Sequence, residues 1–122
     1  MKLLNISKYV SFLLLIIIFI WLVIYANSTH PELDQQTQNN DAKVNLHNLY
    51  IFCLYYWREE GVENLCSIDI ATQSEYGYIP SKNINVAIES GEKVNFSATA
   101  SHKNTKNIFV IDSEGRITEK DK

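Results

Sequence analysis

The strongest pattern along the chain is an unbroken apolar run near its start. Residues 9–26 carry no charged side chain, and Ser11 is the one clearly polar member. At about 1.5 Å per residue, a helix over this run is about 27 Å long, which is close to the thickness of the hydrocarbon core of a bilayer. A helix also pairs its own backbone groups, as a segment in lipid must. The run predicts a single transmembrane helix over residues 9–26, preceded by a short segment of residues 1–8.

The charges on either side of this run indicate its orientation. Lys2 and Lys8 precede it, whereas nine basic and all 14 acidic residues follow it, leaving the following part with a net charge of −5. Because basic residues favour the cytoplasmic side, we expect residues 1–8 in the cytoplasm and the bulk of the chain outside. A cleavable secretory signal is the alternative, since Ile24-Tyr25-Ala26 loosely fits the small-residue cleavage rule, although the apolar run is longer than a usual signal core.

A polar stretch and then a second helical pattern follow. Residues 27–40 are rich in Asn and Gln, and Pro31 forbids a continuous ideal helix, so we expect a linker or a kinked helix. Asp41 is a candidate N-cap for the next helix. Over residues 41–60, apolar side chains recur every three or four positions, and further aromatic residues widen the apolar face to nearly the whole circumference. Such a helix must be mostly covered, by a sheet or by neighbouring subunits, and Gly61 is a natural stop.

Beyond Cys66 the pattern changes to alternation with a period of two. Explicit turns at residues 89–92 and 112–115 separate the alternating segments. The candidate strands are residues 67–72, 84–89, 94–100, 108–112 and 116–118. Strands joined by short turns indicate an antiparallel meander. The preceding helix would bury its apolar face on that sheet, giving an exported α+β domain over residues 41–122.

Composition and charge narrow the possibilities. The 122 residues include 14 aromatic side chains, too many for a disordered chain, and a formal net charge of −3 offers no basic field for nucleic acid. Two cysteines are too few for a zinc site of their own. A Cys53–Cys66 bridge would pin the second helix to the first strand, and export makes oxidation reasonable. Two free buried thiols remain the alternative.

The residues that usually carry chemistry do not assemble into a motif. His30, His47 and His102 lack metal-ligand spacing and are expected on the surface or on a helix face. Glu59, Glu60 and Glu63 lack the spacing of a calcium loop and indicate a solvated helix end. There is no phosphate loop or nucleophile elbow. We therefore expect no enzyme activity, no catalytic residue, no metal, no cofactor and no small-molecule substrate.

Three segments resemble type IV pilins and pilin-like proteins. The stretch AKVNLHNLYIFCLYYW at residues 42–57 is similar to the pilin segment in which an Asn-Leu pair repeats before an aromatic helix end with a cysteine. The stretch EYGYIPSKNINVAI at residues 75–88 looks like a Tyr-Gly-Tyr lead into a first hairpin strand. FSATASHKNTKNIFVIDSEGRIT, residues 96–118, looks like the last pilin strands with their Asp-x-x-Gly turn. The resemblance implies a structural subunit or minor component of a pilus or secretion pseudopilus, with other pilin-like subunits and membrane lipid as partners.

The start of the chain departs from the pilin pattern. Pilins have a Gly before a Phe-Thr-Leu-like start and a Glu five residues in, whereas here Ser11 precedes Phe12 and the fifth residue is Ile16. This favours an alternative function: a permanently anchored extracytoplasmic binding module that does not polymerise. Under either function, the residues expected to serve the membrane or assembly role are Phe12, Leu13, Leu14, Leu15, Ile16, Ile17, Ile18, Phe19, Ile20, Trp21, Leu22, Val23, Ile24 and Tyr25.

Overall fold

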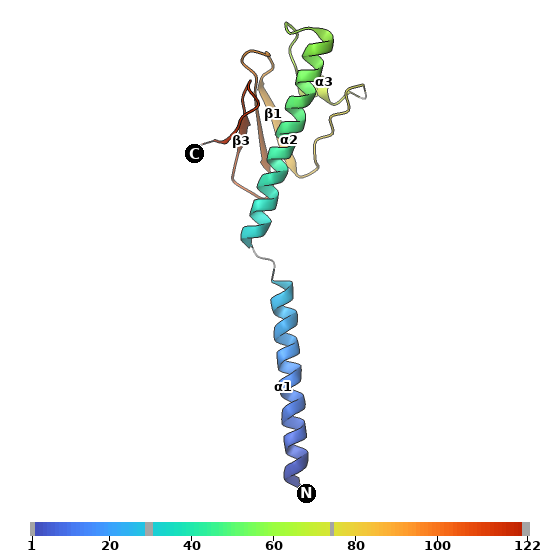
Figure 1. The fold of residues 1–122 in the computed structure, drawn as a ribbon, viewed down its shortest axis with the longest axis vertical. Coiled ribbons are helices and arrows are strands. Elements are labelled where there is room, and N and C mark those ends of the chain that lie inside the picture. Colours follow the sequence, from blue (N-terminus) through green and yellow to red (C-terminus); the bar gives the residue numbers. More distant parts are fainter. Residues whose placement is uncertain (1, 29–30, 74, 121–122) are drawn as a thin grey trace. The chain divides into compact units, whose positions relative to one another are not determined.

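The computed structural model describes residues 2–28, 31–73 and 75–120, and it divides the chain into two compact units, residues 1–34 and 35–122. Helix α1 spans Lys2–Asn27 and is drawn in blue in Figure 1. It begins ahead of the expected start at Tyr9, so the short segment assigned to residues 1–8 is helical from Lys2. It ends one residue past Ala26. One helix near the N-terminus is long and apolar enough to cross a membrane, as the apolar run predicted.

Helix α2 spans Pro31–Glu60 and begins earlier than the sequence pattern indicates. Proline is tolerated in the first helical turn because the first amides of a helix have no internal partner. Glu32 and Asp34 add favourable negative charge to that turn. The expectation of Asp41 as an N-cap is therefore wrong, since Asp41 lies inside α2. The helix stops at Gly61, where φ is +107°, as predicted.

One side of α2 forms the core with the sheet. Ala42, Leu46, Leu49, Cys53 and Trp57 recur at helical spacing and are at most 1% exposed. The apolar face is narrower than the sequence suggested. Of the residues that widened it, Phe52 and Tyr56 are buried, whereas Ile51 and Tyr55 are about half exposed. Val44, which belongs to the recurring apolar positions, is also about half exposed. The covered face of α2 is thus a stripe, and the rest of the circumference faces outward.

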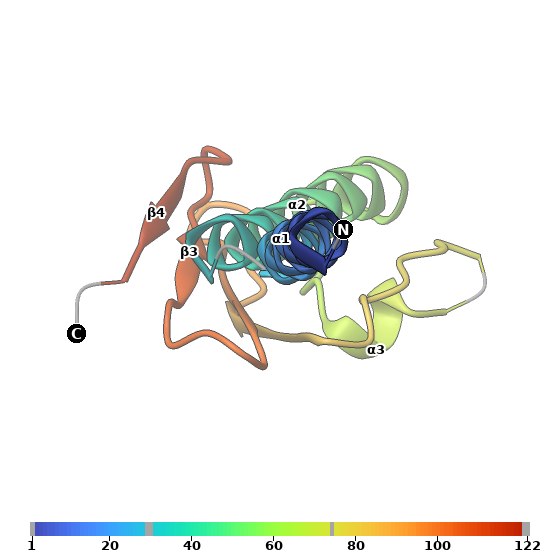
Figure 2. The same cartoon turned by 90° about the horizontal axis from the view of Figure 1, so that it is seen from below.

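The sheet is a four-stranded antiparallel meander of order β1-β2-β3-β4. Its strands are β1 (Ile84–Ser90), β2 (Ser97–His102), β3 (Phe109–Ile111) and β4 (Ile117–Glu119). Figures 1 and 2 show α2 lying along this sheet, which confirms the predicted α+β class. On β2 the buried positions alternate, and the small side chains of Ala98 and Ala100 face the core. Small residues there leave room for the bulky side chains of α2.

Four of the five predicted strands need correction. Residues 67–72 form no strand. They hold the short helix α3, Ile68–Ala71, whose N-cap is Ser67, because the Ser67 hydroxyl accepts a hydrogen bond from the Ile70 amide at 3.2 Å. The strand predicted at residues 94–100 starts at Ser97 rather than at Val94, and Val94 lies in the β1–β2 connection. Strand β3 is shorter than the predicted residues 108–112, and β4 lies at Ile117–Glu119 rather than at the predicted residues 116–118.

Candidate functional site

Helix α1 presents its apolar side chains on every side. From Phe12 to Tyr25, all 14 residues expected to serve the membrane or assembly role are exposed, from 41% at Ile16 to 71% at Trp21. Hydrophobic side chains all round a helix need a covering, either lipid or other apolar helices. Chemically, α1 can therefore insert into a bilayer or pack in a bundle.

The disulfide joins the last turns of α2 to the segment that follows them. Cys53 and Cys66 are bonded, with 5.7 Å between their Cα atoms, so the alternative of two free thiols does not occur. Two further hydrogen bonds lie beside the disulfide. The Trp57 indole N–H donates to the Asn64 carbonyl at 3.0 Å, and the Cys66 amide donates to the Gly91 carbonyl at 2.9 Å. The carbonyl of Cys66 lies so close to Gly91 that a side chain at position 91 would clash with it.

A buried asparagine of α2 binds the loop that leads into β1. Asn45 is 5% exposed, and its side-chain oxygen accepts from the Ser81 amide at 3.0 Å. Its side-chain nitrogen donates to the Ser81 hydroxyl at 3.0 Å and to the Asp41 carbonyl at 2.9 Å. Sequence reasoning assigned Asn45 no role. The signal was a polar residue in line with the apolar stripe of the helix, since Asn45 lies next to Leu46 and four residues before Leu49.

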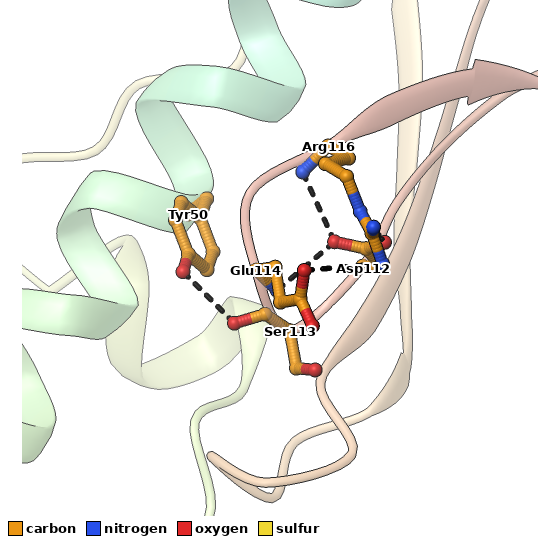
Figure 3. A network of polar contacts seen from close by, with 5 residues as sticks. All are labelled: Tyr50, Asp112, Ser113, Glu114 and Arg116. Carbon is orange, nitrogen blue, oxygen red and sulfur yellow. Dashed lines mark hydrogen bonds and ion pairs between the residues drawn. The ribbon is translucent and has the colours of Figure 1, made fainter.

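The predicted turn at residues 112–115 is an organised polar network (Figure 3). The Asp112 carboxylate accepts from the amides of Glu114 and Arg116 at 2.9 and 3.0 Å and from the Arg116 guanidinium at 2.9 Å. The bond from the Arg116 amide is the largest of the contributions that lower the pKa of Asp112. The same carboxylate raises the pKa of Arg116. Because both side chains are exposed, the network shapes the turn more than it stabilises the fold.

Helix α2 anchors this turn directly. The Tyr50 hydroxyl donates to the Ser113 carbonyl at 3.0 Å, as Figure 3 shows. Gly115 has φ of +79°, and a side-chain carbon there would lie 2.7 Å from the Tyr50 ring. Glycine is therefore required at position 115 for two reasons: the backbone conformation is left-handed, and the Tyr50 ring leaves no room for a side chain.

Two open hollows flank α2. The tyrosine hollow, about 490 Å³, is lined by Ile51, Phe52 and Tyr55 of α2 and by Tyr76, Tyr78 and Ile79 of the loop before β1. The hairpin hollow, about 470 Å³, is lined by Tyr50 and Leu54 of α2 and by Val62, Lys93, Val94 and Ser113. The sequence pattern predicted that the apolar face of this helix is mostly covered, and it gave no sign of either hollow. Nothing in the local pattern shows which aromatic residues the loop before β1 leaves uncovered.

Tyr76 is the centre of an aromatic cluster in the tyrosine hollow. Its ring lies edge-on to Phe52, Tyr55 and Tyr56, with centroids 5.1, 6.4 and 5.7 Å away. Its hydroxyl donates to a Glu60 carboxylate oxygen at 3.0 Å. Desolvation, followed by this bond, raises the pKa of Tyr76 to about 12. A neutral tyrosine thus holds a carboxylate beside the hollow.

Tyr78 is the most enclosed side chain of the same hollow. It is 6% exposed, and burial raises its pKa to about 12. Its hydroxyl has no hydrogen-bond partner among the described residues. Because that oxygen is itself covered, Tyr78 acts as an apolar wall of the hollow.

The histidines and acids do not converge on a common centre. His30 lies outside the described residues. His47 is exposed on α2, whereas His102 was expected on the surface but is buried at the end of β2, where its Nδ1 accepts from the Asn104 amide at 3.1 Å. Its position on the core-facing side of β2 explains the difference. Within residues 2–28, 31–73 and 75–120, no group of three or more His, Cys, Asp or Glu side chains could hold a metal ion.

The architecture is therefore a long apolar helix, together with a disulfide-pinned helix on a small antiparallel sheet. This architecture is compatible with a pilin-like fold. A scan of protein-family models and a search of curated proteins both found no match to the chain.

Proposed function

We propose that this chain is a pilin-like structural subunit, or a minor component, of a type IV pilus or related secretion pseudopilus. The observation that carries the proposal is the apolar surface of α1, which is exposed on every side, in a chain whose other unit is compact and cross-linked. A subunit that assembles through its N-terminal helix needs such a surface. The resemblance at residues 42–57, 75–88 and 96–118 supplies the family.

Lateral packing of α1 would provide the assembly. In a bilayer, helices associate through close van der Waals fit, which small residues favour. Residues 9–26 contain only Ser11 and Ala26 as small members. Bulky side chains suit a filament core, where α1 would be covered by other copies of itself. We propose membrane lipid and other pilin-like subunits as the partners, with the α2–sheet unit outside the cytoplasm and no enzyme activity.

A second candidate is a membrane-anchored extracytoplasmic module that never polymerises. It is favoured by the same shortage of small residues and by the lack of a carboxylate in residues 9–26. A buried ion pair can fix the register of an assembly, and this run has no acid to form one. Under this candidate, α1 is covered by lipid alone.

The N-terminus of the protein recovered from cells separates the two candidates. A chain that starts at Phe12 supports the processed subunit, because the leader must be removed before the helix can leave the bilayer. A chain that starts at Met1 supports the anchored module. A start near Asn27 contradicts both and shows a secreted domain. The mass of the intact protein, read together with its first residues, gives the answer.

A variant of α1 gives an independent test. Ile16→Glu places a charge in the apolar run, at a cost of about 3 kcal/mol near the centre of a membrane helix. The anchored module should lose membrane retention. In a filament subunit, an amine of a neighbouring copy can meet the carboxylate, and incorporation should hold or improve. Ile16→Val is the matched control, and quantitative blotting of the membrane and filament fractions is the measurement.

A further inference from the structure

The two hollows lie on opposite flanks of α2. At 3.6 residues per turn, the α2 residues of the tyrosine hollow and those of the hairpin hollow are separated by about 130° around the helix axis. Each group also lies roughly a third of a turn from the stripe centred on Leu49 and Cys53, which faces the sheet. Because the hollows face away from each other, one molecule cannot close them on itself. A second molecule can contact both flanks in succession.

Each hollow carries a strongly exposed aliphatic side chain. Ile79 at the tyrosine hollow is 84% exposed, and Val94 at the hairpin hollow is 81% exposed. Both come from connections between elements, and most of each side chain is open to solvent. A projecting apolar side chain on one flank and an apolar hollow on the other are the two halves of a heterologous, head-to-tail contact.

The charges on the two flanks are complementary. The Glu60 carboxylate accepts from the Tyr76 hydroxyl at 3.0 Å, and Glu75 directly precedes Tyr76, so both acids lie beside the tyrosine hollow that Tyr76 lines. Arg58 also lies there, with its guanidinium 4.8 Å from the centre of the Tyr55 ring, but it is paired with Glu59. A net negative charge therefore remains beside this hollow.

The hairpin hollow presents an ammonium instead. Lys93 lines it, directly before Val94, and no ion pair holds Lys93 among the residues that the structure describes. Its neighbour Glu92 accepts a long hydrogen bond, 3.5 Å, from Asn95. The Lys93–Val94 tip thus combines one ammonium with one exposed aliphatic side chain.

We propose that the Lys93–Val94 tip of one copy docks in the tyrosine hollow of the next copy. Val94 then packs on the aromatic wall, and the Lys93 ammonium reaches the carboxylates of Glu60 and Glu75 and the faces of the tyrosines. This contact rests on the proposed function, since assembly through α1 raises the effective concentration of neighbouring copies. Each copy donates one tip and offers one hollow, so the contact repeats along an assembly instead of ending at a dimer.

A zero-length carbodiimide cross-link tests the contact with native side chains. The full chain is produced in membranes as a mixture of ¹⁵N-labelled and unlabelled copies and treated with carbodiimide, which joins an amine to a carboxylate in direct contact. We expect mixed-isotope peptides that join Lys93 to Glu60 or Glu75. In the same cells, a benzophenone amino acid at position 16 reports separately whether α1 packs against another copy.

Matched variants give the size of the effect. Val94→Ser and Ile79→Ser should each lower the yield of the Lys93 cross-link by about tenfold, the factor that corresponds to losing one buried aliphatic side chain. Val44→Ser is the control, because Val44 is 56% exposed on α2 and lines neither hollow. Since all three side chains are exposed, none of these variants should lower the melting temperature.

The outcomes separate this contact from the proposed function. Cross-links at both position 16 and Lys93 support the two together. A cross-link at position 16 without one from Lys93 to Glu60 or Glu75 overturns the docking contact and leaves assembly through α1 standing. No cross-link at either position overturns both. A Lys93 cross-link to a different protein shows that the tip serves another partner and overturns the contact between copies.

Discussion

Removal of the Cys53–Cys66 bridge is expected to destabilise the α2–sheet unit by about 3 kcal/mol. The bond joins residues 13 apart, which closes a loop of 14 residues counting both ends. In the chain-entropy model, a loop of this size restricts the unfolded chain by about 10 cal/mol/K, or about 3 kcal/mol at 25 °C. For a unit of fewer than 100 residues, that corresponds to a melting temperature lower by roughly 12–24 °C.

The reduced protein and the double alanine variant separate the stability that comes from the cross-link from the stability that comes from the packed sulfur atoms. Cys53 is fully buried and Cys66 is 2% exposed, so the double variant Cys53→Ala/Cys66→Ala loses packed sulfur atoms as well as the cross-link. Reduced wild type keeps both sulfurs and should show the loop contribution alone. The double variant should therefore melt at or below the temperature of the reduced protein.

Near-ultraviolet circular dichroism of the full chain in detergent is the suitable assay. Trp57 is 1% exposed and lies one turn after Cys53, so its signal reports on this core, whereas Trp21 lies exposed on α1. The intact mass first verifies that the wild type is oxidised. A reduced protein or double variant that melts within about 4 °C of the oxidised wild type, the shift for 1 kcal/mol, would refute the reasoning.

Three further substitutions test individual contacts. Asn45→Ala should lower the free energy of unfolding by about 1–3 kcal/mol in chemical denaturation, because the Ser81 amide loses its acceptor. A variant that is as stable as the wild type would show that water takes the place of the Asn45 side chain. Gly115→Ala should lower it by at least about 1 kcal/mol, since φ is positive and the added carbon meets the Tyr50 ring. Tyr50→Phe is the comparison for Gly115→Ala, because it keeps the ring of Tyr50 and loses only the hydroxyl. Asp112 has a lowered pKa, so its carboxylate stabilises the fold above the ordinary value of 3.8, and this stability disappears as the pH falls through the lowered value. Asp112→Asn should therefore be less stable than wild type at pH 7, and the difference should shrink below pH 3.8 in urea titrations; a difference independent of pH would contradict the assignment.

Local pattern was enough to predict α1 and the ends of several elements. An 18-residue run without charge needs no tertiary partner to be helical, because a helix satisfies its own backbone. Gly61 and Gly115 likewise marked a helix stop and a turn, since their backbone conformations depend on adjacent residues. Local pattern was misleading at residues 67–72, where alternating polar and apolar residues resemble a strand. The Ser67 cap and a single turn of helix account for them instead.

The sequence by itself determined the apolar helix and the α+β class, and it left a Cys53–Cys66 bond and two free thiols as alternatives, between which the structure decided. The tertiary structure alone decided which side chains are covered. Ile51 and Phe52 are neighbours of similar hydrophobicity, yet Ile51 is 49% exposed and Phe52 7%. Their difference depends on where the loop that carries Tyr76 packs, more than 20 residues later in the chain. The same is true of Asn45, which is buried because Ser81 meets it, and of the two hollows beside α2. Burial is a property of contacts between distant segments, and no local period encodes those contacts.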